Sequence, residues 1–199
     1  MGNKNNNKEK GSKNIEYIYD IPDLDKSKLK TEYKIVFIGE SGVGAKSNLI
    51  NILSGLKYDE YYPSTTSASF SEIKIKLKQK KDIALNLCDT IGQKSFRQLT
   101  KIFLKDIDCA VIGYDITDRE TFDEAKYYWY KTIKDEFQTC KLICFIGNKK
   151  DVEERRAVEK EEATDFAESN NLRFFEISCK TGEGIKEFLD DLVYNLLKQ

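Results

Sequence analysis

The sequence predicts an α/β protein with a doubly wound, mostly parallel sheet of six strands. From Tyr33 onward, segments of strand character alternate with segments of helical character, as in chains whose parallel strands are joined by crossover helices. Two strand segments, 111–112 and 142–146, are continuously apolar, which is typical of strands buried on both faces. The last segment, 183–197, carries its apolar residues at helical spacing on one face.

The individual elements follow from the local apolar pattern. Segment 33–39 is a β-branched apolar run, and segment 70–78 alternates apolar residues with lysines, as a half-exposed antiparallel edge strand does. In segment 121–137 an apolar stripe at helical spacing indicates ordinary core packing. The expected strands are 33–39, 70–78, 83–89, 109–115, 142–147 and 173–177. The expected helices are 46–54, 96–104, 121–137, 160–169 and 183–197.

The first thirty residues differ from the rest of the chain. Residues 1–14 are rich in Asn, Lys and Gly with almost nothing apolar, so we expect them to be disordered. Residues 15–30 have scattered apolar side chains and one proline, which leaves loose packing and mobility as alternatives. We therefore expect an N-terminal extension, 1–30, that is largely disordered, followed by one domain, 31–199.

Composition excludes several classes of function. The 33 basic and 34 acidic residues nearly balance, so the chain has no global field for nucleic acid. No apolar run is long enough to cross a bilayer. The five cysteines include no CxxC pair and the chain has no histidine, which argues against a zinc site and against an imidazole base. The apolar neighbours of the cysteines indicate reduced core thiols in a cytosolic protein.

The first chemical motif is a glycine-rich turn between the strand at 33–39 and the helix at 46–54. Such a turn cradles a polyphosphate with backbone N–H groups, here those of Gly39, Ser41, Gly42, Val43 and Gly44. Lys46 would neutralise the β- and γ-phosphates, and the Ser47 hydroxyl would bind Mg²⁺. Ala45 interrupts the pattern, which expects lysine directly after the last glycine. The alternative is a tight turn with no phosphate.

The second motif follows the strand at 83–89. Asp89, at the carboxyl end of that strand, can hold Mg²⁺ through water, and the N–H of Gly92 can approach a γ-phosphate. Gln93 can then orient an attacking water molecule as the catalytic residue. In isolation the same residues are also typical of a polar turn after a strand.

Two further motifs follow the strands at 142–147 and 173–177. The carboxylate of Asp151 would accept from the ring N–H and the exocyclic amine of guanine, while Asn148 braces the loop and the Lys149 stem covers the base. In the segment Ser178, Cys179 and Lys180, a backbone N–H would meet the guanine oxygen and the lysine stem would lie over the base. Each motif alone also fits a solvated polar loop.

These four motifs occur in order, each at the carboxyl end of an expected strand. In this arrangement the chain resembles the small GTPases of the Ras superfamily, most closely the Rab branch, from Tyr33 to the C-terminus. Segments 95–100 and 114–122 are also similar to typical Rab segments. The resemblance implies a P-loop NTPase fold of the small G-domain type that binds GTP or GDP with Mg²⁺ and hydrolyses GTP slowly.

The resemblance also implies a register. Counted from Ser47, the base-stacking aromatic falls on Tyr58, and the threonine that binds Mg²⁺ when a γ-phosphate is present falls on Thr65. Because both spacings run correctly from Ser47, the extra residue is confined to the loop. This favours a bulge at Ala45, with Lys46 and Ser47 in their usual roles, over the alternative in which Ala45 occupies the lysine position.

Some residues depart from the family pattern. Ile91 replaces a small residue beside Gly92, Lys94 replaces an acidic residue after Gln93, and Ser67 and Ser69 alter the segment that meets partners. The leading hypothesis is a GTP/GDP-cycling switch that hydrolyses GTP, in vesicle trafficking or related signalling. The alternative is a catalytically impaired nucleotide-binding protein that acts through interactions.

The resemblance implies a monomer that meets an exchange factor, a GTPase-activating protein and effectors through switch regions 57–70 and 91–104. No prenylation cysteine stands near Gln199, so we expect a cytoplasmic protein with at most peripheral membrane contact. Gly2 and the lysines that follow it resemble a myristoyl-plus-basic anchor, but Asn6 stands where the consensus has serine or threonine. A solvated leader without lipid is the alternative.

Overall fold

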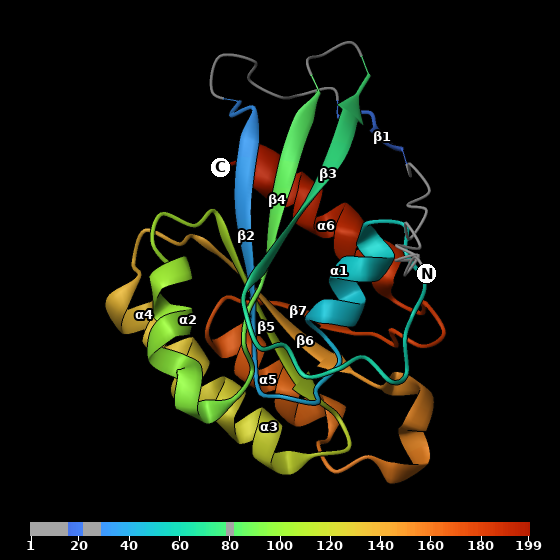
Figure 1. Ribbon diagram of the computed structural model, residues 1–199, viewed down its shortest axis with the longest axis vertical. Helices are drawn as coiled ribbons and strands as arrows, with labels where there is room; N and C mark the ends of the chain where they lie inside the picture. The colour runs from blue at the N-terminus through green and yellow to red at the C-terminus, as the bar shows by residue number, and fades with distance from the viewer. Residues whose placement is uncertain (1–15, 22–28, 79–81) are drawn as a thin grey trace, which may run out of the picture.

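A computed structural model describes residues 16–21, 29–78 and 82–199. Within these ranges the strands form one sheet in the order β1-β3-β4-β2-β5-β6-β7 (Figure 1). Neighbouring strands are parallel except for β3 and β4, which are antiparallel. The strands are β1 (Tyr17–Tyr19), β2 (Glu32–Ile38), β3 (Ser69–Leu77), β4 (Ile83–Asp89), β5 (Cys109–Asp115), β6 (Leu142–Asn148) and β7 (Arg173–Glu176).

Most of the helices lie between successive strands, and α6 follows the last strand. They are α1 (Ser47–Leu53), α2 (Arg97–Phe103), α3 (Arg119–Glu124), α4 (Lys131–Glu136), α5 (Lys160–Ser169) and α6 (Ile185–Leu197). Two short 3₁₀ segments, η1 (Lys94–Phe96) and η3 (Lys150–Arg155), follow β4 and β6. A π-helical segment, η2 (Ala125–Tyr130), joins α3 to α4, so the single helix expected at 121–137 is continuous but carries a wider turn at its centre.

The helices cover both faces of the sheet, which confirms the doubly wound α/β prediction. One core packs α1 and α6 against the sheet, and the other packs α3, η2 and α5 against its opposite face. Figure 1 shows α1 and α6 on one side and α2, α3 and α4 on the other. Among the described residues, no helix is long and apolar enough to cross a membrane.

Strand β1 corrects two expectations. The described sheet has seven strands rather than six, and β3 is an edge strand over only part of its length, because Tyr17–Tyr19 pair in parallel with its residues Ile75 to Leu77. The Tyr17 hydroxyl donates to the Leu53 carbonyl at 3.0 Å, and the Tyr19 hydroxyl donates to Asp190 at 2.9 Å. These contacts come from distant elements, so a three-residue strand left no local signal. The disorder expected at 1–14 lies outside the described residues.

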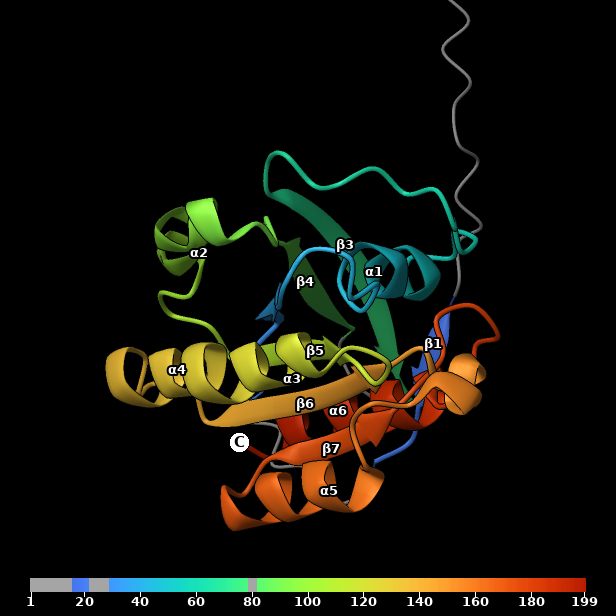
Figure 2. The same cartoon turned by 90° about the horizontal axis from the view of Figure 1, so that it is seen from below.

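The parallel strands bring four loops to one edge of the sheet. The carboxyl ends of β2, β4, β6 and β7 lie at the same edge because these strands run in the same direction. Figure 2 shows the loop after β2 beside α1, with the loops that follow β6 and β7 close to it. This edge carries the candidate site, as expected for an open α/β sheet.

Candidate functional site

A cleft of about 410 Å³ opens at this edge of the sheet. The predicted site residues that line it are Ser41, Gly42, Gly44, Lys46, Ser47, Tyr58, Thr65, Gly92, Asn148, Lys149, Asp151, Cys179 and Lys180. Further lining residues, which the sequence did not single out, are Asn48, Asp59, Glu60, Tyr62, Pro63, Ser64 and Val152. The remaining predicted residues, Gly39, Val43, Asp89, Gln93 and Ser178, lie outside this lining.

Lys46, and not Ala45, faces the cleft. The Lys46 ammonium donates to the carbonyl oxygen of Glu40 at 2.6 Å and therefore spans the glycine-rich loop. Burial lowers the pKa of Lys46 to about 8, although the carboxylates of Asp89 and Glu40 oppose this effect. Ala45 is fully buried in the core, and helix α1 begins two residues after it, at Ser47. The extra residue is thus accommodated inside the loop.

Gly92 packs directly against this loop. A Cβ atom at this position would lie 2.7 Å from the Ser41 nitrogen and 2.8 Å from the Lys46 ammonium. Both distances are too short for a carbon atom, so only glycine brings this backbone so close to the loop.

Three side-chain oxygens converge at the start of α1. The Ser47 hydroxyl donates to Asp89 Oδ2 at 2.5 Å and lies 3.0 Å from the Thr65 hydroxyl. Burial raises the pKa of Asp89, against the effect of the Ser47 hydrogen bond and the Lys46 charge. The other carboxylate oxygen, Oδ1, is buried without a hydrogen-bond partner. A buried, unpaired carboxylate oxygen beside two hydroxyls suits a hard cation.

The loops after β6 and β7 are joined to the glycine-rich loop by one buried amide. Asn148 donates from Nδ2 to the Val43 carbonyl at 2.9 Å, and its Oδ1 accepts from the backbone N–H of Cys179 at 3.0 Å. Beside it, the Ser178 hydroxyl donates to Asp151 Oδ1 at 2.5 Å. These bonds fix the Asp151 carboxylate at the wall of the cleft.

The side chains at this end are held by ion pairs. Lys149 has a left-handed backbone (φ 68°), and its ammonium lies 2.6 Å from Asp115 Oδ2. Lys180 and Glu60 face each other across the cleft at 3.9 Å. Tyr58, half-buried against the main core, contributes an aromatic wall.

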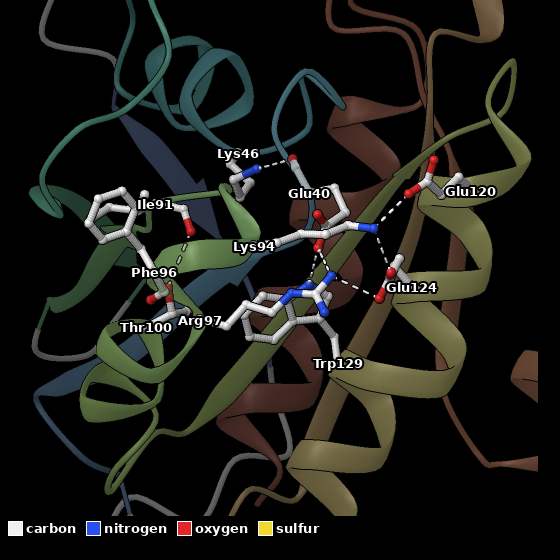
Figure 3. A network of polar contacts seen from close by, with 10 residues as sticks. All are labelled: Glu40, Lys46, Ile91, Lys94, Phe96, Arg97, Thr100, Glu120, Glu124 and Trp129. Carbon is white, nitrogen blue, oxygen red and sulfur yellow. Dashed lines mark hydrogen bonds and ion pairs between the residues drawn. The ribbon is translucent and has the colours of Figure 1, made fainter.

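A polar network behind the glycine-rich loop ties it to the segment after β4 (Figure 3). Glu40 Oε1 accepts from Arg97 at 2.6 Å and from the Trp129 indole N–H at 3.3 Å. The same guanidinium donates to Glu124 at 2.8 Å and lies 4.1 Å from the centre of the Tyr128 ring. Arg97 on α2 therefore connects the glycine-rich loop to α3 and η2.

Lys94 belongs to this network and not to the cleft. Its ammonium lies 2.6 Å from Glu120 and 2.8 Å from Glu124 on α3. Lys94 follows Gln93 directly in the sequence, but its charge is paired with glutamates of α3 (Figure 3). Gln93 itself is exposed.

We expect the two cations of this network to contribute unequally to stability. The Arg97→Ala variant should lower the free energy of unfolding by about 3 kcal/mol, because it leaves the carboxylate of Glu40 buried without its charge partner. Lys94→Ala should change it little, because the ammonium is half exposed and exposed ion pairs contribute little. Urea unfolding of both variants measures this difference. Equal losses would contradict the unequal roles.

The chain is similar to known proteins over most of its length. A model described as the Ras family matches residues 34–198. The chain belongs to the Ras family. Ras-related protein Rab-2B from Dictyostelium discoideum is 35% identical over 168 residues, which are 84% of this chain and 81% of that protein. GTP-binding protein ypt5 from Schizosaccharomyces pombe is 33% identical over 164 residues, 82% of this chain and 77% of that protein.

A third relative is Ras-related protein Rab-21 from Geodia cydonium, 33% identical over 165 residues, which are 83% of this chain and 71% of that protein. Together these matches show a GTPase of the Ras superfamily and of its Rab branch, as the resemblance predicted.

Some residues that shape the site of this Rab-branch GTPase were missed by sequence reasoning. Trp129 lies in segment 121–137, whose apolar stripe indicates core packing, but a buried indole N–H needs an acceptor, which here is Glu40. The Asn48 side chain donates to the backbone carbonyl of Asp59 and accepts from its N–H, both at 3.0 Å. A polar residue on an otherwise apolar helix face is the sequence feature that indicates such a role. The Arg97 contacts left no such signal, because their partners lie far away in sequence.

Proposed function

We propose that this Rab-branch protein binds GTP and GDP in the cleft and hydrolyses GTP to GDP and phosphate. The observation that carries the proposal is the buried ammonium of Lys46 under a loop of glycines. A buried cation needs an anionic partner, yet its hydrogen bond goes to a neutral carbonyl oxygen. The β- and γ-phosphates of a nucleotide would supply the missing negative charge.

The oxygens of Ser47, Thr65 and Asp89 would hold Mg²⁺ beside those phosphates. Among the described residues no three acidic, cysteine or histidine side chains gather as a metal cage. The donor set of one carboxylate and two hydroxyls supports magnesium, since Mg²⁺ is usually held by one or two carboxylates together with substrate phosphates. When bound, the ion would offset the negative charge of the phosphates. Thr65 lies on the loop between α1 and β3, so its contact would depend on which nucleotide is present.

The base would lie between Tyr58 and the loops after β6 and β7. Asp151 would accept two hydrogen bonds from guanine, and the stems of Lys149 and Lys180 would cover its faces. The fixed position of the Asp151 carboxylate, which accepts from Ser178, supports this orientation. The backbone N–H groups of Gly39, Ser41, Gly42, Val43, Gly44 and Gly92 would surround the phosphates.

We infer that intrinsic hydrolysis is slow. Gln93 would orient the attacking water, and no arginine lines the cleft in the part of the chain that the structure describes. Without an arginine at the phosphates, rates on the order of 10⁻⁴ to 10⁻³ per second are expected, and an activating protein would supply the missing charge.

Two measurements on the recombinant protein test the proposal. The nucleotide that co-purifies should be GDP or GTP, and GTP loaded in a single turnover should be converted to GDP and phosphate. The absence of any guanine nucleotide, together with no binding of labelled GDP, would refute nucleotide binding. Binding without conversion would leave the nucleotide site intact and reject only the hydrolysis.

Gln93→Leu should leave GTP binding unchanged and slow hydrolysis about tenfold, because leucine cannot hydrogen-bond the water. Single-turnover assays with and without an activating protein measure this effect. Gln138→Leu, which replaces an exposed glutamine outside both switch regions, is the matched control and should hydrolyse GTP like the wild type. A wild type already as slow as the Gln93 variant in both assays would favour the alternative function.

That alternative is a nucleotide-binding protein without useful hydrolysis, which acts through its interactions. One observation favours it: Gln93 is exposed and lies outside the lining of the cleft, whereas Ile91 beside it is buried. The structure of this segment in the GTP-bound protein decides whether Gln93 reaches the phosphates.

Regulators and effectors would meet the switch regions 57–70 and 91–104. The exposed apolar residues Phe70, Leu99 and Ile102 lie in these regions and support a protein-binding role. Vesicle trafficking is the process we propose, with the protein acting as a cytoplasmic monomer that contacts membranes peripherally. Gly2 and its lysines lie outside the described residues.

A further inference from the structure

The inserted residue Ala45 lies against Gly113 at the centre of the sheet. Ala45 is fully buried and belongs to the core between the sheet and α1. A Cβ atom built on Gly113 would come within 2.7 Å of the Ala45 Cβ. Two carbon atoms attract each other best at about 3.5–4.0 Å, so a side chain at Gly113 and the Ala45 methyl group cannot both fit.

Space, and not backbone conformation, explains a glycine at this position. Gly113 lies on β5 between Ile112 and Tyr114, in a strand whose residues are all buried. Its φ is not positive, so an L-residue could adopt its backbone conformation. Glycine weakens a strand interior and marks the close approach of another part of the chain. The part that approaches here is Ala45.

The neighbouring residues show what this contact controls. Ala45 turns toward the sheet, whereas Lys46 lines the cleft and donates to Glu40. On the same face of β5, Val111 belongs to the core that also contains Leu49 of α1. If a side chain at residue 113 filled the space that the Ala45 methyl group occupies, the loop would have to move away from the sheet, and Lys46 would move with it.

We propose that Gly113 is a positioning residue for the phosphate-binding loop: the missing side chain on β5 makes room for the inserted Ala45, which keeps Lys46 and Ser47 at the nucleotide. The insertion and the glycine are therefore one compensated feature. This inference rests on the proposed nucleotide binding, in which the glycine-rich loop holds the phosphates.

A cycle of substitutions that preserves the loop length tests the contact. Gly113→Ala should weaken the binding of fluorescent-labelled GDP about tenfold, since an extra methyl group in this packed core would push Ala45 and the loop outward. Ala45→Gly should bind like the wild type within about threefold. The double variant A45G/G113A should return to the affinity of Ala45→Gly, because the new methyl group then occupies the space left by the old one.

Two further variants separate positioning from general damage to the core. Ala110→Gly removes a buried methyl group from β5 on the side of the other core, so A110G/G113A should show no recovery. Lys46→Ala should also reduce GDP affinity by a smaller factor in the Gly113→Ala background than in the wild type, because Lys46 is already displaced. A purely structural role of Gly113 would leave that factor unchanged and would overturn the proposal.

Urea unfolding of the nucleotide-free proteins separates failure of the inference from failure of the proposed function. If the wild type binds no GDP, the proposed function fails. The contact is then tested by the urea midpoint of unfolding alone, which Gly113→Ala should lower and the added Ala45→Gly should restore. A Gly113→Ala variant that matches the wild type in both affinity and midpoint would overturn the contact. Loss that Ala45→Gly does not restore would overturn it as well.

Discussion

Replacing Lys46 by alanine is expected to weaken GDP binding about a hundredfold. The reason is that the phosphates lose a buried cation, and a hydrogen bond to a charged group contributes about 1.5–3 kcal/mol. The Lys46 side chain spans the glycine-rich loop, and its ammonium nitrogen, Nζ, lies 2.6 Å from the Glu40 carbonyl oxygen. Titration of fluorescent-labelled GDP into the variant measures the loss. Lys57→Ala, which removes an equal charge from an exposed position outside the cleft, should bind like the wild type.

Deletion of Ala45 completes this test. Because Ala45 is accommodated inside the loop, its removal should change GDP affinity by about 1 kcal/mol or less. The opposite pattern would contradict the structure of the loop: a sharp gain in affinity on deleting Ala45, with almost no effect of Lys46→Ala. In that case Ala45 would occupy the place of the lysine.

Asp151→Asn is expected to change the preferred base of the protein from guanine to xanthine. The asparagine amide can donate to the additional carbonyl of xanthine, whereas the two donors of guanine lose their shared carboxylate. We expect GTP affinity to fall about a hundredfold, since each unmet hydrogen bond to a charged group costs about 1.5–3 kcal/mol. Competition of GTP and xanthosine triphosphate for the labelled site measures the exchange.

Asp59→Asn is the matched control for this prediction. Asp59 also lines the cleft, but its carboxylate accepts from the backbone of Tyr61 within its own loop. The same substitution there should leave the preference for guanine unchanged. If Asp151→Asn kept full selectivity for GTP, Asp151 would be excluded from the base site.

The sequence predicted the parallel part of the sheet well because its signals are local. The segments 83–89, 109–115 and 160–169 match β4, β5 and α5 residue for residue. Each is an apolar or periodic block bounded by polar residues, so burial alone sets its limits. Most of the residues expected after β2, β4, β6 and β7 line one cleft for a related reason, since strand direction determines where the carboxyl ends of the strands meet.

The misses come from contacts between distant parts of the chain. Strand β1 depends on hydrogen bonds from Tyr17 and Tyr19 to α1 and α6. Lys94 turns away from the cleft because two glutamates of α3 attract it. The fit of Ala45 against Gly113 joins residues that are far apart in the sequence. No local pattern carries information of this kind.

Strand β1 also determines how much of the sheet remains open to a foreign strand. An unpaired strand edge is a template for the addition of another chain. Within the described residues, β1 occupies the outer side of β3 only at Ile75 to Leu77, at the end remote from the cleft. The stretch from Ser69 to Lys74 leads directly back to the loop that carries Thr65. A strand docking on this edge would therefore lie next to the most nucleotide-dependent loop of the protein, with its register limited by the chain's own N-terminal segment.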